Sequence, residues 1–400
     1  MKLYAKIHFR IWLWLLPVVA GIYSVYSFSQ TDPNQVFFSQ SWYWQFQKFM
    51  WRLGFQERLW SVGIYSLIIL IWFIVYQKIY TAFVAGQLLN RHIIRSLIFT
   101  IGLLLLANPA LSSDIYNYIF NAKMVWVYGA NPHRQVALNF PDDQWLRFMH
   151  NTHTPAPYGY GWTMLSLVPS VIGQNHLKLT LLLVKMFVGA FFAGVIFFQS
   201  KIGKLLAATK WREGIVLFAL NPLVLIETFG NGHNDVVMMA LALASIYLAL
   251  RASRQKGLLL WGASGLFFLA SYSIKYGSIA ILVGVGLWYA LSLLKKKFSL
   301  GGALAIAQFS PLLTIRSQRF LPWYLIWPLS FIPFISERWL VKLALFFSLS
   351  SLLSYLPHLY RGEYTIEVQR LRQLITFGLP IILILFEWMK KVDWLGLKLK

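Results

Sequence analysis

Long apolar runs separated by short basic links dominate the chain. Each run is roughly 15 to 20 residues long, close to the length that an α-helix needs to cross the hydrocarbon core of a bilayer. Runs of this kind predict an all-α, polytopic membrane protein with about twelve transmembrane helices. The expected spans are Ile11–Phe28, Trp60–Gln77, Ile93–Asn108, Leu177–Phe198, Gly214–Phe229, Val236–Leu250, Leu258–Ile274, Ser278–Leu294, Leu300–Ile315, Pro322–Ile335, Leu340–Leu356 and Leu371–Met389.

The orientation of these spans depends on one short segment, Trp162–Ile172, which is apolar but contains Pro169. If it crossed the membrane, the four cations of the next link, Lys201, Lys204, Lys210 and Arg212, would face outward. If it is re-entrant or lies in the interface, they face the cytosol together with the Lys295–Lys297 triplet and the C-terminal lysines, as the positive-inside rule favours. We therefore expect both termini to be cytoplasmic and residues 109–175 to form a large outer loop.

The composition indicates no soluble domain, so we expect residues 1–400 to form a single integral membrane domain. The chain is 58% hydrophobic, and its 36 Lys and Arg against 13 acids give a net charge of +23. Because those cations lie at the ends of apolar runs, they need no nucleic acid as a partner, only membrane lipids. The absence of cysteine excludes disulfides and a thiol nucleophile. The N-terminal run is expected to be a first span, not a cleaved signal peptide.

Within the outer loop, Ile115–Tyr128 places apolar residues at helical spacing and predicts an amphipathic helix lying on the membrane surface. Asp142 and Asp143 adjoin Pro141 and are expected in a solvated loop. Trp162–Ile172 is expected to be a short re-entrant or interfacial helix. No internal repeat is visible.

Polar residues gather in five segments that this topology places on the outer side. Since polar groups near the membrane are costly unless paired or solvated, their clustering predicts a cavity. The five segments hold Asp114 after the third span, His153 and Tyr158 in HTPAPYGYG, the motif GNGHND (Asn231 to Asp235), Lys275 in SYSIKYG, and Arg316 and Arg319 just before LPWYLIWPL.

These residue types suit the transfer of a group from a lipid phosphate. Asp114 could act as general base on an acceptor hydroxyl. A lone carboxylate fits single-displacement inversion better than retention, which usually calls for a second carboxylate. Cationic side chains bind phosphate through charge-assisted hydrogen bonds, and the candidates are Lys275, Arg316 and Arg319. The candidates for binding the sugar or the acceptor are Tyr118, His153, Tyr158, His233, Asn234, Asp235, Trp323 and Tyr324. The His and Asp spacing is not diagnostic of a metal site, and no cofactor is expected.

The order of motifs carries a resemblance over about residues 95–330. A span leads into SSDIYNYIFNAKMVWVYGANPH, followed by PYGYGWTMLSLVPSVIG, NPLVLIETFGNGHND, IKYG and LPWYLIWPL. This resembles the GT-C superfamily of polyprenyl-phosphate-sugar glycosyltransferases, and most of all the bacterial polyprenyl-phosphate-mannose-dependent mannosyltransferases of cell-envelope glycolipid assembly. Two spans precede the one that leads into Asp114, whereas many of these enzymes start with that span. Asp114 also stands alone where many members carry a paired acidic motif.

The resemblance implies that Asp114 is the catalytic base and that GNGHND and IKYG line the cavity. It implies an inverting transfer of a hexose, with mannose expected, from a polyprenyl monophosphate to a glycolipid or glycan acceptor, without a metal. The enzyme would lie in the bacterial plasma membrane, with its active site on the outer, periplasmic face.

Structural interpretations stay open for each residue. Asp114 could cap the following helix, as Ser and Asp often do, and GNGHND could be a turn with a helix cap. Lys275 could extend to lipid headgroups, and Arg316 and Arg319 could contact them too. HTPAPYGYG could be a turn only, and Trp323, Tyr324 and Trp327 could form an aromatic belt.

The alternative function is a multi-pass transporter or lipid flippase, since twelve spans is a common count. Transporters typically show repeats and ionisable residues near the membrane midplane. Here the polar residues lie at one face, apart from Lys185, which favours the enzyme. A non-catalytic subunit of an envelope-assembly complex is a weaker alternative.

Overall fold

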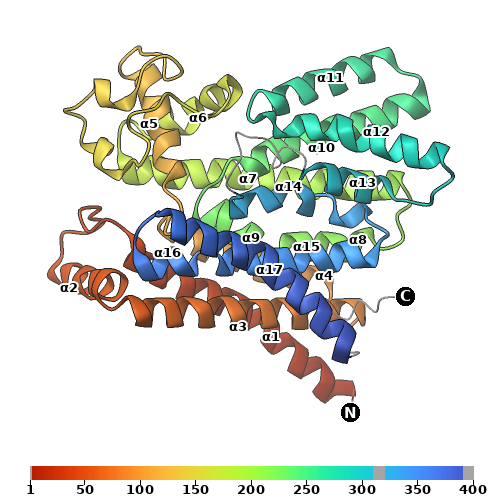
Figure 1. The fold of residues 1–400 in the computed structure, drawn as a ribbon, viewed down its shortest axis with the longest axis horizontal. Helices are drawn as coiled ribbons and strands as arrows, with labels where there is room; N and C mark the ends of the chain where they lie inside the picture. The colour runs from red at the N-terminus through yellow and green to blue at the C-terminus, as the bar shows by residue number, and fades with distance from the viewer. Residues whose placement is uncertain (1, 310–319, 391–400) are drawn as a thin grey trace.

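The computed structural model describes residues 2–309 and 320–390, and within these ranges the chain forms helices and no strands (Figure 1). This confirms the all-α prediction. The longer helices are α1 (Lys2–Ser27), α2 (Ser41–Trp51), α3 (Arg58–Val84), α4 (Asn90–Leu105), α5 (Asp114–Trp126), α6 (Tyr160–Ile172), α7 (Leu177–Leu205), α10 (Asp235–Gln255), α11 (Leu258–Tyr272), α12 (Ala280–Leu293), α15 (Arg338–Leu353) and α17 (Ile366–Lys390). Shorter helices are α8 (Trp211–Ala219), α9 (Pro222–Leu225), η5 (Ile226–Gly230), α13 (Leu300–Ala307), η9 (Pro322–Leu325), α14 (Ile326–Leu329), η10 (Ile332–Phe334) and α16 (Leu356–Arg361).

Seven helical segments of the described chain are long and apolar enough to cross a membrane, or eight if one bent pair counts as a span. The chain is therefore an integral, polytopic membrane protein. The predicted number of about twelve spans is not confirmed. Helices α4 and α11 have 16 and 15 residues, so they are about 24 Å long against a hydrocarbon core of about 30 Å.

The predicted span Pro322–Ile335 is wrong as a single helix. It is divided into η9, α14 and η10, and each of these short pieces contains one proline. Proline lacks the N–H that would continue a helical ladder and its ring clashes with the preceding turn, which explains the breaks. For the predicted span Leu300–Ile315, helix α13 ends at Ala307, and residues 310–315 lie outside the described residues.

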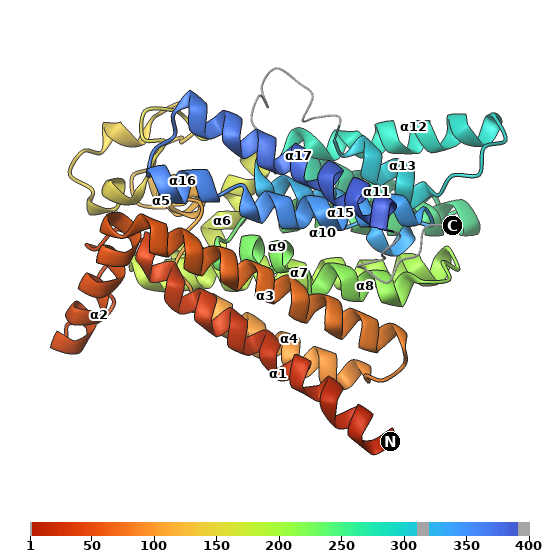
Figure 2. The same cartoon turned by 60° about the horizontal axis from the view of Figure 1, so that its bottom comes forward.

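The basic loops between helices lie at the same end of the molecule as the beginning of α1 and the end of α17. Helix α1 begins and α17 ends there (Figures 1 and 2). The Arg254 guanidinium donates a hydrogen bond to the Leu205 carbonyl, and this contact joins the ends of α10 and α7. A cavity lined by Lys210, Glu213 and Arg338 brings the α7–α8 link to the start of α15. The opposite end carries α2, α5 and α16 (Figure 1), so the molecule has one basic end and one loop-rich end.

Helix α5 starts where the sequence predicts a surface helix, but the prediction that it lies on the surface is wrong. Every residue from Ile115 to Met124 is buried, including the polar residues. The Lys123 ammonium lies 2.6 Å from the Asp143 carboxylate and 4.0 Å from the centre of the Trp145 ring. The loop after α5 therefore folds back over the helix and covers its polar side.

The same contact corrects the expectation that Asp143 lies in a solvated loop, because its side chain is only 2% exposed. Asp142 is exposed, as expected. Burial alone would raise the pKa of Asp143, but the hydrogen bonds from Lys123, the Trp145 N–H and Tyr128 outweigh it and lower the pKa. The pair stabilises the fold above the carboxyl's ordinary pKa, and this stability is lost as the pH falls through the lowered value.

We expect Lys123→Met to lower the free energy of unfolding by about 3–5 kcal/mol, because it leaves Asp143 as a buried, unpaired charge. Thermal or denaturant unfolding of the detergent-solubilised chain measures this. Asp142→Asn, at the exposed neighbouring acid, is the control and should change stability by less than about 0.5 kcal/mol. Equal stability of the two variants would show that the ion pair does not hold the loop.

Helix α6 matches the short helix predicted for Trp162–Ile172. Its 13 residues span about 20 Å, too short to cross the hydrocarbon core. The prediction that it is re-entrant or interfacial remains a prediction.

The centre of the molecule is a bent helical segment in which every residue from Val216 to Ala240 is buried. Helices α8 and α9–η5 meet at an angle of 52°, at Asn221 and Pro222. The Asn221 side chain accepts a hydrogen bond from the Leu223 N–H at 2.9 Å, which caps the second part. This bend brings the GNGHND motif into the interior, where its polar side chains need partners.

Candidate active site

Asp114 is the first residue of α5 and its side chain keeps 19% of its exposure. Ser113, not Asp114, holds the N-cap position, so the sequence alternative that Asp114 caps the helix does not describe the observed geometry. Its backbone N–H lies 3.3 Å from the Ser112 hydroxyl oxygen, which accepts the hydrogen bond. The Tyr158 hydroxyl forms a hydrogen bond with the Asp114 carboxylate. Ser112 thus holds the backbone of Asp114 and Tyr158 holds its carboxylate, which stays partly exposed and open to a substrate.

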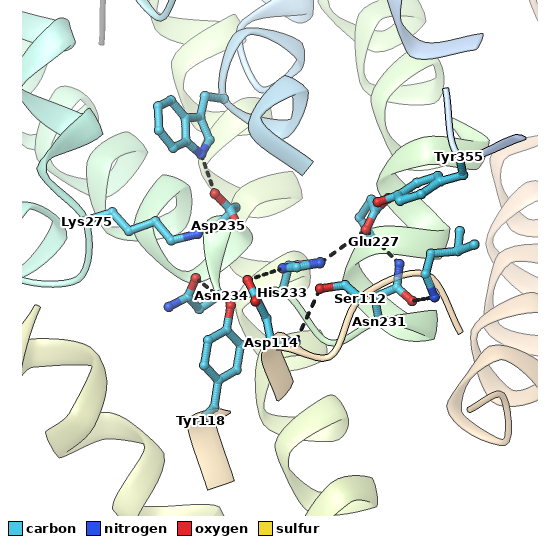
Figure 3. A network of polar contacts seen from close by, with 12 residues as sticks. Ser112, Asp114, Tyr118, Glu227, Asn231, His233, Asn234, Asp235, Lys275 and Tyr355 are labelled. Atoms are coloured by element: carbon cyan, nitrogen blue, oxygen red, sulfur yellow. Dashed lines mark hydrogen bonds and ion pairs between the residues drawn. The ribbon is translucent and has the colours of Figure 1, made fainter. Parts of the chain in front are cut away.

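His233 lies directly behind this carboxylate and is fully buried (Figure 3). Its Nδ1 is 3.7 Å from Asp114 Oδ2, and its Nε2 is 3.4 Å from Glu227 Oε2. The ring stacks on Trp323, with centroids 3.9 Å apart and planes 19° apart. A single imidazole therefore lies between two carboxyl groups, with one ring nitrogen facing each, and packs on an aromatic face.

Glu227 is the functional-site residue that the sequence reasoning missed. It is fully buried, accepts a hydrogen bond from Asn231 Nδ2 at 2.8 Å and one from the Tyr355 hydroxyl at 3.0 Å. A signal was available, since Glu227 stands alone among apolar residues in LVLIETF. An ionisable residue inside an apolar span is by default a candidate for function.

On the other side of Asp114, Lys275 is held by Asp235 (Figure 3). The Lys275 ammonium lies 2.7 Å from Asp235 Oδ2, and the Trp327 indole N–H donates to Asp235 Oδ1 at 2.6 Å. The ammonium also lies over the rings of Tyr158 and Tyr324, at 5.7 and 5.9 Å from their centres. With its side chain 12% exposed, Lys275 is a fixed cation at the edge of the site.

Glycines allow the segments of the site to approach closely. The Gly159 N–H donates to the Ile274 carbonyl at 2.9 Å, and a Cβ on Gly159 would stand 1.9 Å from the Ser273 carbonyl oxygen. This contact places Tyr158 beside Lys275. Gly232 has φ +75°, a left-handed conformation that favours glycine, and a Cβ there would meet Ile115 at 2.6 Å. The PYGYG and GNGHND motifs thus have a steric reason for their glycines.

Tyr118 closes the site from within α5. Its hydroxyl donates to Asn234 Oδ1 at 3.2 Å, and its ring packs edge-on against Tyr158 at 4.8 Å. Tyr118 and Asn234 are both fully buried. They therefore contact other protein groups and support the Tyr158 side chain from within the protein.

Burial raises the pKa of the Asp114 carboxyl. The Lys275 charge and the hydrogen bond from Tyr158 oppose this shift, while the Asp235 charge adds to it. Burial also holds the pKa of His233 well below its usual range, and the nearby Lys275 charge lowers it further. His233 is therefore neutral at physiological pH and carries a single N–H.

Most of the sequence-predicted site residues meet in this one place. The structure brings together Asp114, Tyr118, Tyr158, His233, Asn234, Asp235, Lys275, Trp323 and Tyr324. His153 is exposed in the loop before α6 and takes no part in the contacts given above. Arg316 and Arg319 lie outside the described residues. Across residues 2–309 and 320–390, no three His, Asp or Glu side chains are placed to hold one metal ion.

Comparisons with known proteins point to one family. No solved structure matches the chain. The chain is 25% identical to alpha-(1->6)-mannopyranosyltransferase A of Mycobacterium tuberculosis over 163 residues, which are 39% of this chain. The match spans only 30% of that relative's length. The family model described as alpha-(1->6)-mannopyranosyltransferase, N-terminal domain, matches residues 8–291. Because that match covers more than half of the sequence, the chain belongs to the alpha-(1->6)-mannopyranosyltransferase family, in agreement with its predicted resemblance to mannosyltransferases.

Proposed function

We propose that this chain is an inverting membrane glycosyltransferase. It moves a hexose, with mannose expected from the family, from a polyprenyl monophosphate to an envelope glycolipid or glycan. The observation that carries the proposal is the placement of Asp114, a partly exposed carboxylate between a buried imidazole and a fixed cation. The family match over residues 8–291 supports the sugar and the reaction class.

In the proposed reaction Asp114 accepts the proton of an acceptor hydroxyl. The freed oxygen forms a bond to the anomeric carbon of the donor, while the bond from that carbon to the phosphate oxygen breaks. The bonding electrons leave with the polyprenyl phosphate, and the anomeric centre inverts. One carboxylate suffices, because no glycosyl-enzyme intermediate is needed.

Lys275 is proposed to bind the departing phosphate. One of its three N–H groups is used by Asp235, which leaves two for phosphate oxygens. The pairing fixes the ammonium in place and adds no requirement for a metal or cofactor. Arg316 and Arg319 remain the further candidates for phosphate binding, as the sequence suggests.

His233 is proposed to position Asp114 and not to bind a sugar. It is fully buried, and both of its nitrogens face carboxyl groups of the protein. With a proton on Nδ1, the neutral ring directs its N–H toward Asp114 Oδ2. Its Nε2 then accepts a hydrogen bond from the protonated carboxyl group of Glu227, whose other two hydrogen-bond partners, Asn231 and Tyr355, are neutral.

The basic end of the molecule is proposed to face the cytosol. The positive-inside rule favours this orientation, and it places both termini in the cytosol. The loop-rich end, with α5 and the predicted outer loop, then faces the periplasmic side of the plasma membrane.

Sugar transfer in proteoliposomes tests the function. The donor is synthetic polyprenyl-phosphate mannose, and the acceptor is a short-chain glycoside of α-1,6-linked mannobiose. We expect a product longer by one mannose with inverted anomeric configuration, identified by mass spectrometry and NMR. If folded protein transfers no polyprenyl-linked hexose, the glycosyltransferase proposal fails and a transporter becomes the leading explanation.

The pH profile tests the electrostatic link between Lys275 and Asp114. A base must be ionised, so activity falls as the pH drops through the raised pKa of Asp114, at a higher pH than for an ordinary aspartate. We expect Lys275→Gln to move this acidic limb of kcat/KM to still higher pH, because the cation holds the pKa down.

The double variant Lys275→Gln, Asp235→Asn is the matched control for that shift. It also removes the Asp235 charge, which acts on Asp114 in the opposite sense, so its acidic limb should lie closer to that of wild type. Identical limbs in all three proteins would mean that Asp114 is not the titrating base.

A further inference from the structure

A second cavity adjoins Asp114 at the loop-rich end and is separate from Lys275. Its volume is about 630 Å³, and its wall includes Ser112 and Ser113, the two residues directly before Asp114. The remaining wall comes from the chain after α1, from the end of α2 and the chain up to the start of α3, from the first turn of α5 and the residues before it, from the loop between α5 and α6, and from α16 and the residues after it. We name it the serine-side cavity. Ser112 and Lys275 lie on opposite sides of Asp114 (Figure 3).

Aromatic rings form two parts of the wall of the serine-side cavity. Trp51 and Phe55 are stacked at 6.0 Å, and His358 and Tyr364 are stacked at 3.9 Å with planes 22° apart. Tyr364 is 48% exposed, so its ring is accessible. Flat, rigid aromatic faces with polar edges suit the apolar C–H faces of a pyranose ring and cost little conformational entropy on binding.

The polar groups of the serine-side cavity suit the hydroxyl groups of a sugar. Asp32 places a carboxylate in the wall, and Arg147 is already paired with it at 3.2 Å. The Arg58 guanidinium donates to the Leu359 carbonyl at 3.3 Å. Carboxylate, amide and guanidinium groups of this kind hydrogen-bond sugar hydroxyls.

The serine-side cavity is connected to Asp114 through its wall. Ser112, which lines the cavity, accepts a hydrogen bond from the Asp114 backbone N–H at 3.3 Å. The Ser113 hydroxyl lies 3.3 Å from His150 Nε2, which also lines the wall. A ligand resting here could therefore present a hydroxyl to the carboxylate of Asp114.

We propose that the serine-side cavity binds the terminal sugars of the acceptor, a neutral hexose oligosaccharide, with its reacting hydroxyl directed at Asp114. The donor phosphate then enters from the Lys275 side, so the two substrates meet at Asp114 from opposite directions. This assignment rests on the proposed glycosyl transfer and specifies where its acceptor binds. It moves acceptor recognition to Trp51 and Tyr364, away from the site residues that the sequence indicates.

The test compares Trp51→Ala and Tyr364→Ala with Trp44→Ala, a half-exposed tryptophan on the same helix as Trp51 that does not line the cavity. Transfer to the mannobioside gives the KM for the acceptor. Slow hydrolysis of the donor without acceptor reports the fold and the donor site. Saturation-transfer NMR with α-1,6-mannotriose measures glycan binding independently of catalysis.

We expect the acceptor KM to rise about tenfold or more in the two cavity variants, the size typical of losing an aromatic contact. Donor hydrolysis and Trp44→Ala should stay close to wild type, and the mannotriose signal should weaken only in the cavity variants. An unchanged acceptor KM with an unchanged NMR signal overturns the assignment while transfer itself stands. A wild-type chain that binds mannotriose through Trp51 and Tyr364 but transfers no hexose keeps the cavity and overturns the enzymatic function.

Discussion

Replacing Asp114 by Asn should lower kcat by about a hundredfold or more, the effect expected for losing a general base. Asparagine has the same shape but cannot accept the proton of the acceptor hydroxyl. Its amide can still hydrogen-bond with Tyr158 and with the ring of His233, so the fold should be kept. The measurement is mannose transfer in proteoliposomes at matched amounts of folded protein.

Asp142→Asn is the matched control for this substitution, because it removes one negative charge from an exposed position in the same loop. It should transfer at the wild-type rate. If Asp114→Asn transfers as fast as wild type, Asp114 only begins a helix and the proposed mechanism is wrong. A mutant that binds donor and acceptor normally but transfers slowly places the loss in the chemical step.

Replacing His233 by Leu should lower kcat by about a hundredfold, with little change in the KM for the acceptor. The reason is that a carboxylate displaced by about 1 Å from its working position loses this much rate. Leucine fills the space against Trp323 but offers no donor to Asp114.

Comparing His233→Asn with His233→Leu tests whether His233 acts through an N–H directed at Asp114. The side-chain amide N–H of Asn can take the place of the Nδ1–H that faces Asp114 Oδ2 at 3.7 Å. Most of the activity should return, although the contact to Glu227 is lost. If Asn and Leu are equally slow, His233 does not act through a hydrogen bond to Asp114. If both raise the acceptor KM and leave kcat alone, His233 binds sugar, as the sequence first suggested.

The sequence predicted which segments meet at the site because topology limits the choice. Once Asp114, the GNGHND motif and Lys275 lie at ends of helices on the same side, few arrangements keep them apart. The sequence could not predict which of these side chains pair with one another. That Lys275 is held by Asp235, with Trp327 on the other oxygen, depends on a segment broken by three prolines, which hydropathy read as one span.

The pattern of apolar and polar residues also could not predict which polar side chains are buried. Helix α5 has the polar stripe of a surface helix, but Lys123 is matched by Asp143 from a loop about 20 residues away in the chain. Glu227 was overlooked for a related reason. Its partner Tyr355 is distant in sequence, so the sequence shows only one of the two groups that donate hydrogen bonds to the carboxyl, the nearby Asn231.

That distance affects how the protein is made. The ribosome adds roughly 5–20 residues per second, and Tyr355 follows Glu227 by 128 residues. For roughly ten seconds after its synthesis, Glu227 has only its near neighbours in sequence, Asn231 and His233, as polar partners. The bent segment formed by α8, α9 and η5 must therefore wait in the insertion machinery or in a half-formed bundle until α15 and α16 arrive. A chain that stops before Tyr355 should be a substrate for membrane quality control even if all its earlier helices are inserted.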